Sequence, residues 1–378
     1  MHHTQQRSQL YVRGIISQLH LTPPSASNLP RPPRRTLIAT SPHRSWEVSP
    51  NIDTTSYWDQ GYLRTRPTYP ASFYHQIYDY HTAASPSSTA PTFTLAHDIG
   101  AGPGHVAHAL AHKFPHVHVS DIDPRHLTYA QHLHHTNSPS TTTTKFTYTL
   151  ARAEHLAAHF PPASADLILS ALLFPLLPSP ATALRACHTV LKPAGGGTLA
   201  IAFYGLPHFS EAPYAATCQP LLDGIVDRLY QSAIRRATET QRASYKREAD
   251  AAASWLDCLA FPAAEWRAVQ RWTWNRGWAR MGFFTGRAGG FVVEPVSRVR
   301  AGEEEVVEVE DRGLWRREWD VCRLRRFVSG LLPLEGVAGV EGGVVSRGDW
   351  GALAAEMGGM GVKRAFSWPV VLVLAKRR

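Results

Sequence analysis

Apolar residues between positions 93 and 205 fall into short runs that are separated by stretches with helical spacing. Five of these runs, each bounded by turn residues, are typical of buried strands. The strands are expected at residues 93–100, 116–123, 145–151, 165–173 and 197–205. Helices are expected at 105–114 and 125–134. Strands that alternate with helices predict a parallel sheet with helices on both faces.

A further helix is expected ahead of this core. Within residues 68–81, Phe73, Ile77 and Tyr80 recur at helical spacing. The first fifty residues are instead rich in Pro, Ser, Thr and Arg. Such a segment buries too little apolar surface to fold, so we expect 1–50 to be a disordered extension.

The segment after the fifth strand has a different character. Residues 206–350 hold most of the tryptophans and read as helices with loops, which predicts a helical, tryptophan-rich insertion and cap. The acidic run 303–311 within it is expected to be a solvated strand or loop. Residues 366–378 contain an apolar run that reads as a closing strand returning to the sheet, so 51–378 is expected to form a single domain.

The N-terminal fifty residues carry six arginines and one acidic residue, Glu47. An Arg- and Ser-rich segment with so few acids resembles a mitochondrial transit peptide. The alternative is a flexible extension, which we favour because prolines from Pro23 onwards interrupt an amphipathic helix. We therefore expect a cytoplasmic protein and keep mitochondria as the alternative.

Charge and composition narrow the class of partner. The net charge of the 378-residue chain is +9, and the N-terminal fifty residues supply much of it, so a nucleic-acid partner is not expected. The hydrophobic share of 44% is enough for a substantial core, but no run is long enough to predict a membrane span. The four cysteines form no C-x-x-C pair, so neither a disulfide framework nor a metal site is expected.

The stretch HDIGAGPGH follows the first predicted strand and opens a helix. Its Gly100, Gly102 and Gly104 allow a sharp turn and a close approach of a ligand to the backbone. With Asp98 they give the register D-x-G-x-G-x-G. A dinucleotide fingerprint needs a small residue where His105 stands. A phosphate-binding loop needs a following Gly-Lys-Ser/Thr, which is absent from the sequence.

Further candidates follow the second and third strands. Asp121 ends the second strand, where a carboxylate can accept hydrogen bonds from the hydroxyls of a ribose. Asp123 is its weaker neighbour. Ala153 and Glu154 follow the third strand, at a place that would bring them near an adenine.

In this order and spacing, these residues resemble a class I S-adenosylmethionine-dependent methyltransferase. The glycine register, Asp121, the Ala153-Glu154 pair, SADLILS and LKPAGGGTLAI carry the resemblance over residues 56–205. It implies S-adenosylmethionine as cofactor and a Rossmann-like, doubly wound, seven-stranded, mostly parallel α/β sheet with a helical insertion after strand five. The cofactor-binding residues that it implies are Asp98, Gly100, Ala101, Gly102, Gly104, Asp121, Ile122, Ala153, Glu154 and Ser170.

A narrower resemblance covers nearly all of residues 56–378. The segments RPTYP, AFYGLPHFS, SWLDCLAFPAAEWRAVQRWTWN, FVVEPVS and WPVVLVLAKRR are similar to segments of fungal trans-aconitate-methyltransferase-like proteins. The chain departs from that family after strand four, where the family often shows a His-Trp pair and this chain has LLFPLL. The departure puts in doubt any ligand contact assigned to Leu173 or Phe174.

The resemblance implies methyl transfer to the oxygen or nitrogen of a small-molecule acceptor, with a carboxylate as one candidate. A carboxylate needs no general base, so no catalytic residue is assigned. The substrate-binding candidates are Tyr62, Arg66 and Tyr204, with Arg66 suited to a carboxylate. Two other classes stay open. One is a degenerate binding or regulatory protein without turnover, and the other is an NAD-dependent reductase, which His105 disfavours.

Three histidines, His105, His108 and His112, could suggest a metal site. On a helix they lie opposite the apolar arc that includes Val106 and Leu110. We therefore expect them to face water and predict no metal site.

Overall fold

The computed structural model describes residues 66–83, 92–137, 145–332 and 344–378. These ranges belong to one compact unit, Pro42–Arg378. The predicted disordered or targeting segment 1–50 lies outside the described residues, and so does the substrate candidate Tyr62.

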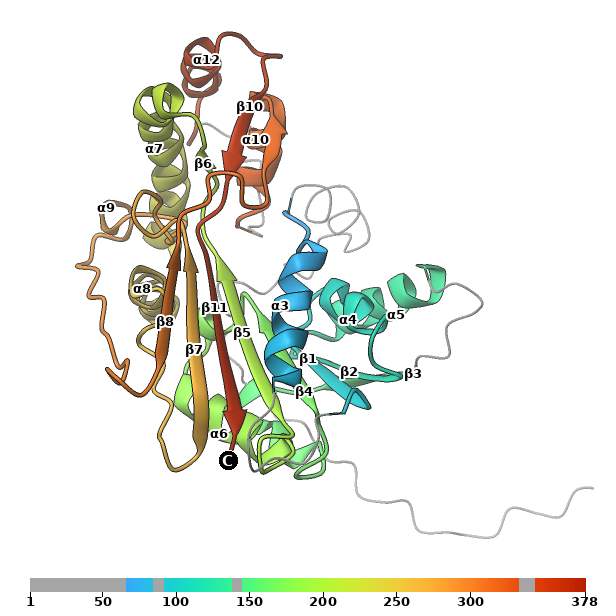
Figure 1. Cartoon of the computed structure of the whole chain (residues 1–378). Coiled ribbons are helices and arrows are strands. Elements are labelled where there is room, and N and C mark those ends of the chain that lie inside the picture. The colour runs from blue at the N-terminus through green and yellow to red at the C-terminus, as the bar shows by residue number, and fades with distance from the viewer. Residues whose placement is uncertain (1–65, 84–91, 138–144, 333–343) are drawn as a thin grey trace, which may run out of the picture. The chain divides into compact units, whose positions relative to one another are not determined.

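An eight-stranded sheet organises the described residues (Figure 1). Its strands stand in the order β3-β2-β1-β4-β5-β11-β7-β8. Their bounds are β1 Leu95–Ile99, β2 His116–Asp121, β3 Lys145–Leu150, β4 Leu167–Ala171, β5 Thr198–Tyr204, β7 Trp266–Trp274, β8 Glu305–Val309 and β11 Val370–Arg377. Strands β1 to β5 pair in parallel, and β11 is antiparallel to both β5 and β7. The predicted Rossmann-like, mostly parallel fold is confirmed, with one strand more than the seven expected.

Helices cover both faces of this sheet, which explains why its strands are so apolar. β5 is buried along its whole length. In Figure 1, α3 (Ala71–Thr82) lies in front of the sheet and α6 (Pro180–Val190) lies behind it. The face that α3 turns to the sheet includes Phe73, Ile77 and Tyr80, as their spacing predicts.

Short connections bring the ends of the parallel strands to one edge. The elements that follow β1 to β4 are α4 His105–Leu110, α5 Pro124–Asn137, the 3-10 helix η2 Ala153–Ala158 and the 3-10 helix η3 Phe174–Leu176. The strand order changes direction between β1 and β4, which are neighbours in the sheet. Ligands of doubly wound folds bind beyond the carboxyl ends of the strands at such a switch point.

A smaller sheet and several helices lie beyond this edge in Figure 1. The small sheet has the order β6-β10-β9. Its bounds are β6 His208–Phe209, β9 Arg317–Trp319 and β10 Arg364–Ser367, and the accompanying helices are α7 Ala212–Arg236, α8 Glu239–Ala253, α9 Gly286–Gly289, α10 Val321–Ser329 and α12 Arg347–Glu356. None of the helices in the described ranges is long and apolar enough to cross a membrane.

The structure differs from the expectation of helices with loops for 206–350, because β7, β8 and β9 lie in this segment. β7 pairs with β11, and β8, from the acidic run, pairs in parallel with β7 at the edge of the large sheet. The buried face of β7 includes Val269, Arg271 and Thr273. The Arg271 guanidinium is buried and donates from Nε to Glu304 Oε2 at 2.7 Å. A charged residue in the middle of a buried face hides the alternation that would predict a strand.

Candidate active site

The glycine loop joins β1 to α4 at the carboxyl edge of the sheet. Gly100, Gly102 and Gly104 all have positive φ angles, which L-residues with a side chain adopt at a cost. A Cβ atom built on Gly102 would meet no atom of the described residues within 4 Å. The backbone therefore faces open space at Gly102, and a ligand can approach it there.

Hydrogen bonds to two carboxylates hold this loop in place. Asp98, near the end of β1, accepts a bond at Oδ2 from the Ala107 amide in α4, at 2.8 Å. Asp121, at the end of β2, accepts a bond at Oδ2 from the Gly102 amide, also at 2.8 Å. The structure thus brings together Asp98, Gly102 and Asp121, as their positions in the sequence predict.

The Asp98 carboxyl is almost fully buried, at 1% exposure. Its pKa is raised to about 8, mainly by burial; the hydrogen bond from Ala107 opposes the rise, and the negative charge of Asp121 adds to it. Two acidic groups therefore lie within electrostatic reach of each other beside the loop. A positively charged ligand group would favour the ionised form of Asp98.

Asp121 and Asp123 share one neighbour, since His126 Nδ1 lies 3.1 Å from Asp121 Oδ1 and His126 Nε2 lies 3.9 Å from Asp123 Oδ2, but their other contacts differ. Asp123 accepts hydrogen bonds from the Arg125 amide at 2.9 Å and from the Arg125 guanidinium at 2.6 Å, within the first turn of α5. Asp121 accepts the amides of Gly102 and of Asp123, the latter at 2.9 Å. Asp121 therefore belongs to the glycine loop and Asp123 to its own helix. Ile122 between them is half-buried.

The remaining cofactor candidates lie at the ends of neighbouring strands. Ala101 donates from its amide to the Ser120 carbonyl at 3.0 Å, which ties the loop to β2. Ala153 is buried and begins η2, and the Glu154 carboxylate lies 3.8 Å from Arg152 Nε. Ser170 in β4 is fully buried, and its hydroxyl has no hydrogen-bond partner within the described ranges. These positions share the carboxyl edge with the loop.

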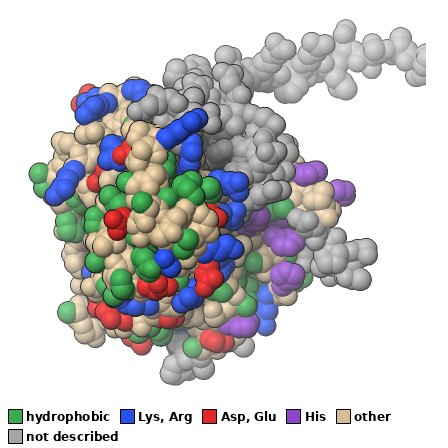
Figure 2. Space-filling model, turned by 90° about the horizontal axis from the view of Figure 1, so that it is seen from above, with side chains coloured by type: hydrophobic (Ala, Val, Ile, Leu, Met, Phe, Trp, Pro, Cys, Tyr) green, Lys and Arg blue, Asp and Glu red, His purple; other side chains and the backbone are tan. Residues whose placement is uncertain are grey.

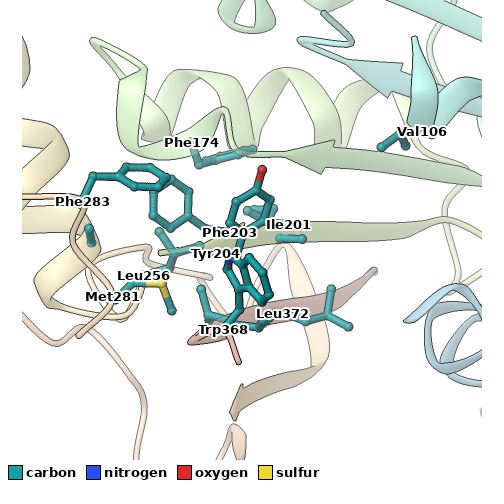
Figure 3. Packing of buried hydrophobic residues seen from close by; sticks show 14 of the residues in the cluster. Val106, Phe174, Ile201, Phe203, Tyr204, Leu256, Met281, Phe283, Trp368 and Leu372 are labelled. Atoms are coloured by element: carbon teal, nitrogen blue, oxygen red, sulfur yellow. The ribbon is translucent and has the colours of Figure 1, made fainter. Parts of the chain in front are cut away.

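The LLFPLL segment follows β4, at the position where the family that the chain resembles often has a His-Trp pair. A Cβ on Gly100 would lie 2.7 Å from Leu173 Cδ2, so Leu173 packs directly against the glycine loop. Phe174 is buried, and Figure 3 shows it in an apolar cluster with Phe203 and Phe283. The Phe203 and Phe283 rings are 5.7 Å apart. The segment thus contributes apolar packing beside the loop.

The two described substrate candidates have different contacts. Arg66 donates from Nη2 to the Gly330 carbonyl at 2.8 Å, and its Cζ lies 5.4 Å from the Phe327 ring centre. Tyr204 ends β5 and is 1% exposed. Arg66 is thereby fixed to the end of α10, whereas Tyr204 is part of the wall beside β5.

That wall is an aromatic cluster that the sequence did not reveal. Tyr69 is stacked on Phe73 at 4.8 Å and lies edge-on to Trp315 at 5.3 Å and to Tyr204 at 6.1 Å. Tyr74 is a further member, because its ring lies 5.3 Å from that of Phe73. Burial raises the pKa of Tyr74, and the charge of Asp98 raises it further, so the cluster reaches toward the glycine loop. Only the pair Tyr69 and Phe73 has a local signal, the spacing of one helical turn.

The histidines of α4 give no metal centre within the described ranges. His105 and His112 are exposed and His108 is half-buried. Figure 2 shows histidine side chains grouped on one part of the visible face, beside atoms that are not described.

Comparisons with known proteins agree with this geometry. A family model described as a methyltransferase domain matches residues 97–201. Methyltransferase pgmE from Aspergillus terreus is 40% identical over 324 residues, which cover 85% of this chain and 93% of that protein. Methyltransferase cfoB from Aspergillus candidus is 34% identical over 85% of this chain and 94% of its own. Methyltransferase ptaI from Pestalotiopsis fici is 33% identical over 85% of this chain and 93% of its own length. The chain therefore belongs to the S-adenosylmethionine-dependent methyltransferase family.

Proposed function

We propose that this methyltransferase acts on a small-molecule acceptor and that a carboxylate is the acceptor group. The observation that carries the proposal is the glycine loop itself. It is fixed by Asp98 and Asp121 and open in front of Gly102. An aromatic cluster reaches toward it through Tyr74, which favours a compact acceptor with an apolar body.

The residues around the loop fit S-adenosylmethionine. The open face of Gly102 would admit the methionine part against the backbone, and Asp121 would accept hydrogen bonds from the ribose hydroxyls. Ala153 and Glu154 would lie near the adenine. The buried Asp98 suits a cofactor with positive charge, since such a charge would favour the ionised form of this carboxyl. When bound, S-adenosylmethionine supplies a methyl group on a positively charged sulfonium that is a good leaving group.

The aromatic cluster supports an acceptor with an apolar body. Three rings lie edge-on to one another at the end of β5, those of Tyr69, Tyr204 and Trp315. Such walls exclude water and hold an acceptor in line for displacement. Arg66 favours a carboxylate as the acceptor group, because a guanidinium can bind a carboxylate through two N–H donors. Its bond to Gly330 would have to be shared or exchanged on binding.

The chain's residues have little proton chemistry to perform in this reaction. The chain's residues would hold the acceptor carboxylate in line with the methyl group that bound S-adenosylmethionine would supply, and the carbon–sulfur bonding electrons would stay with sulfur. The acceptor becomes a neutral methyl ester and no proton is moved. This balance agrees with a site to which we assign no catalytic base.

A panel of labelled-methyl transfer reactions tests the proposal. Wild-type protein would be incubated with labelled cofactor and with small aromatic and aliphatic acids, each paired with its primary amide as a control. We expect label in the acids as base-labile methyl esters and none in the amides. Arg66→Met should raise KM for the acid roughly tenfold and leave KM for the cofactor unchanged.

Other outcomes separate the alternatives. Label in phenols or amines would overturn the proposal of a carboxylate acceptor and would leave the methyltransferase activity supported. Cofactor binding without label in any acceptor would favour a binding protein without turnover, the interpretation that the missing His-Trp pair first suggested.

A further inference from the structure

His134 of α5 contacts the glycine loop at Gly104. It is 2% exposed. Its Nε2 lies 2.8 Å from the Gly104 carbonyl oxygen, and its Nδ1 lies 2.8 Å from the Tyr148 hydroxyl of β3. The imidazole therefore bridges the third glycine of the loop to a neighbouring strand.

The chemistry of these partners fixes the state of the ring. A carbonyl oxygen only accepts, so Nε2 carries the proton and donates to Gly104. Burial lowers the pKa of His134 to about 4, and the nearby His105 and His108 of α4 act in the same direction. The neutral ring then has a lone pair at Nδ1, which accepts a hydrogen bond from the Tyr148 hydroxyl. The Gly104 carbonyl thus fixes the tautomer, and the Tyr148 hydroxyl holds the ring by donating to Nδ1.

Packing leaves this ring one position. The His134 ring is stacked on Phe146 with ring centres 4.1 Å apart. A Cβ on Gly104 would lie 2.9 Å from His134 Nε2 and 2.7 Å from the Ala130 Cβ. Glycine at 104 is therefore what allows the imidazole to approach the backbone so closely. The Gly104 carbonyl also accepts the His108 amide at 2.9 Å, so His134 holds the first turn of α4 as well.

We propose that His134 is a positioning residue for cofactor binding, with Tyr148 as the group that orients it. Together with Asp98 and Asp121 it gives the loop a third fixed point: Asp98 holds Ala107, Asp121 holds Gly102, and His134 holds Gly104. The inference rests on the proposed role of this loop in holding S-adenosylmethionine. A loop released at Gly104 would bind the cofactor only in a fraction of its conformations, and the apparent affinity would fall by that fraction.

Calorimetric titration with S-adenosylhomocysteine tests the inference. We expect His134→Phe, which keeps a ring but loses the donor, to weaken binding about tenfold or more. His134→Gln keeps an N–H donor near the Nε2 position and should recover most of the affinity. Tyr148→Phe should lie between wild type and His134→Phe. His135→Phe, on an exposed neighbour in the same helix, is the matched control and should bind like wild type.

Steady-state kinetics supply the readout that a loss of folded protein would not give. His134→Phe should raise KM for the cofactor and leave KM for the acceptor unchanged. Partial unfolding would instead lower the maximal rate and leave both KM values unchanged. Equal affinity in wild type and His134→Phe would overturn the inference and leave the proposed function standing. Failure of the wild type itself to bind S-adenosylhomocysteine would overturn the proposed site and this inference together.

Discussion

Asp121 and Asp123 are two positions apart and share His126 as a neighbour, but their other hydrogen-bond partners differ. Asp121 accepts the amide of Gly102, and Asp123 accepts the amide and guanidinium of Arg125 at the start of α5. The sequence favours Asp121 as the ribose-binding carboxylate, because Leu127 and Ala130 of the helix that follows are better spaced from Asp121 than from Asp123. The hydrogen bonds favour the same residue for a different reason, since Asp121 is the carboxylate tied to the loop.

Separate substitutions distinguish the two carboxylates. Charge-assisted hydrogen bonds contribute about 1.5–3 kcal/mol, so Asp121→Ala should weaken S-adenosylhomocysteine binding roughly ten- to a hundredfold. Asp123→Ala removes a helix cap and should cost about 0.5–2 kcal/mol of stability with little change in affinity. Calorimetry and urea unfolding of both variants check this. If Asp123→Ala is the one that impairs binding, the assignment of the ribose carboxylate is wrong.

Gly104 offers a second test at this scale. Gly104→Ala has to adopt a φ near 83° and also push a methyl group against Ala130 and His134. Gly290→Ala has to adopt a φ near 65°, but its Cβ would meet no described atom within 4 Å. Both variants pay about 1–2 kcal/mol for the left-handed conformation.

We expect Gly104→Ala to be the less stable of the two by a further 1 kcal/mol or more, about the lower end of the cost of overpacking. Thermal unfolding of both variants measures the difference. Equal melting temperatures would show that the contact among Gly104, Ala130 and His134 relaxes without cost.

At the scale of elements, local patterns predicted local structure. The five parallel strands follow apolar runs, and the loop follows a glycine register, so each signal lies within a few residues. β7 has no such signal, because its buried Arg271 is explained by partners outside the strand. These are Glu304 and the carbonyls of Leu256 and Leu259, which accept from Nη1 at 3.1 Å and from Nη2 at 2.8 Å. A pattern of neighbours in the sequence does not contain those partners.

The Arg271–Glu304 pair connects β7 to the segment that leads into β8. Each member has a second charged neighbour, because Arg300 Nε lies 3.3 Å from Glu304 Oε1 and Asp257 Oδ1 lies 3.9 Å from Arg271 Nη1. Removing one member still leaves a buried charge without its main partner, so Arg271→Met or Glu304→Leu alone should cost about 3–5 kcal/mol of stability. The double variant removes both buried charges of the pair and should cost distinctly less than the two single losses added together. Urea unfolding of the four proteins gives the coupling energy. Simple additivity would contradict the pairing.

At the scale of the whole molecule, the aromatic cluster is assembled from distant segments. Tyr69 precedes the sheet, Tyr204 ends β5, and Trp315 lies just before β9, yet their rings meet. Apolar periodicity identifies such residues as buried but does not pair them across the chain. This is why the glycine loop could be predicted from the sequence and the aromatic cluster could not.

Buried neutral histidines should make stability depend on pH. Burial lowers the pKa of His134 and of His208 to about 4, and it lowers the pKa of His81 and His97 as well. Between pH 6.5 and 4 the unfolded chain therefore binds protons at these sites that the folded chain does not, and stability falls as the pH falls.

The carboxyls with raised pKa values, Asp98 at about 8 and Glu248 at about 7, act in the opposite direction. They are fewer than the histidines, so we expect the free energy of unfolding to decrease from pH 6.5 toward pH 4. Urea unfolding at intervals across this range measures the slope, and His134→Gln should make it shallower. A stability that rises on acidification would show that the histidines are not buried in neutral form.

The central claim is that the loop from Asp98 to Gly104 holds S-adenosylmethionine with its backbone open at Gly102. The most direct test is calorimetric titration of S-adenosylhomocysteine into wild type, Gly102→Val and Gly290→Val, with folding of each checked by circular dichroism. Both substitutions place a branched side chain at a positive φ, but only the first enters the space proposed for the cofactor. We expect binding by wild type and Gly290→Val and no measurable binding by folded Gly102→Val. Equal affinity in all three proteins would contradict the assignment of the cofactor site to this loop.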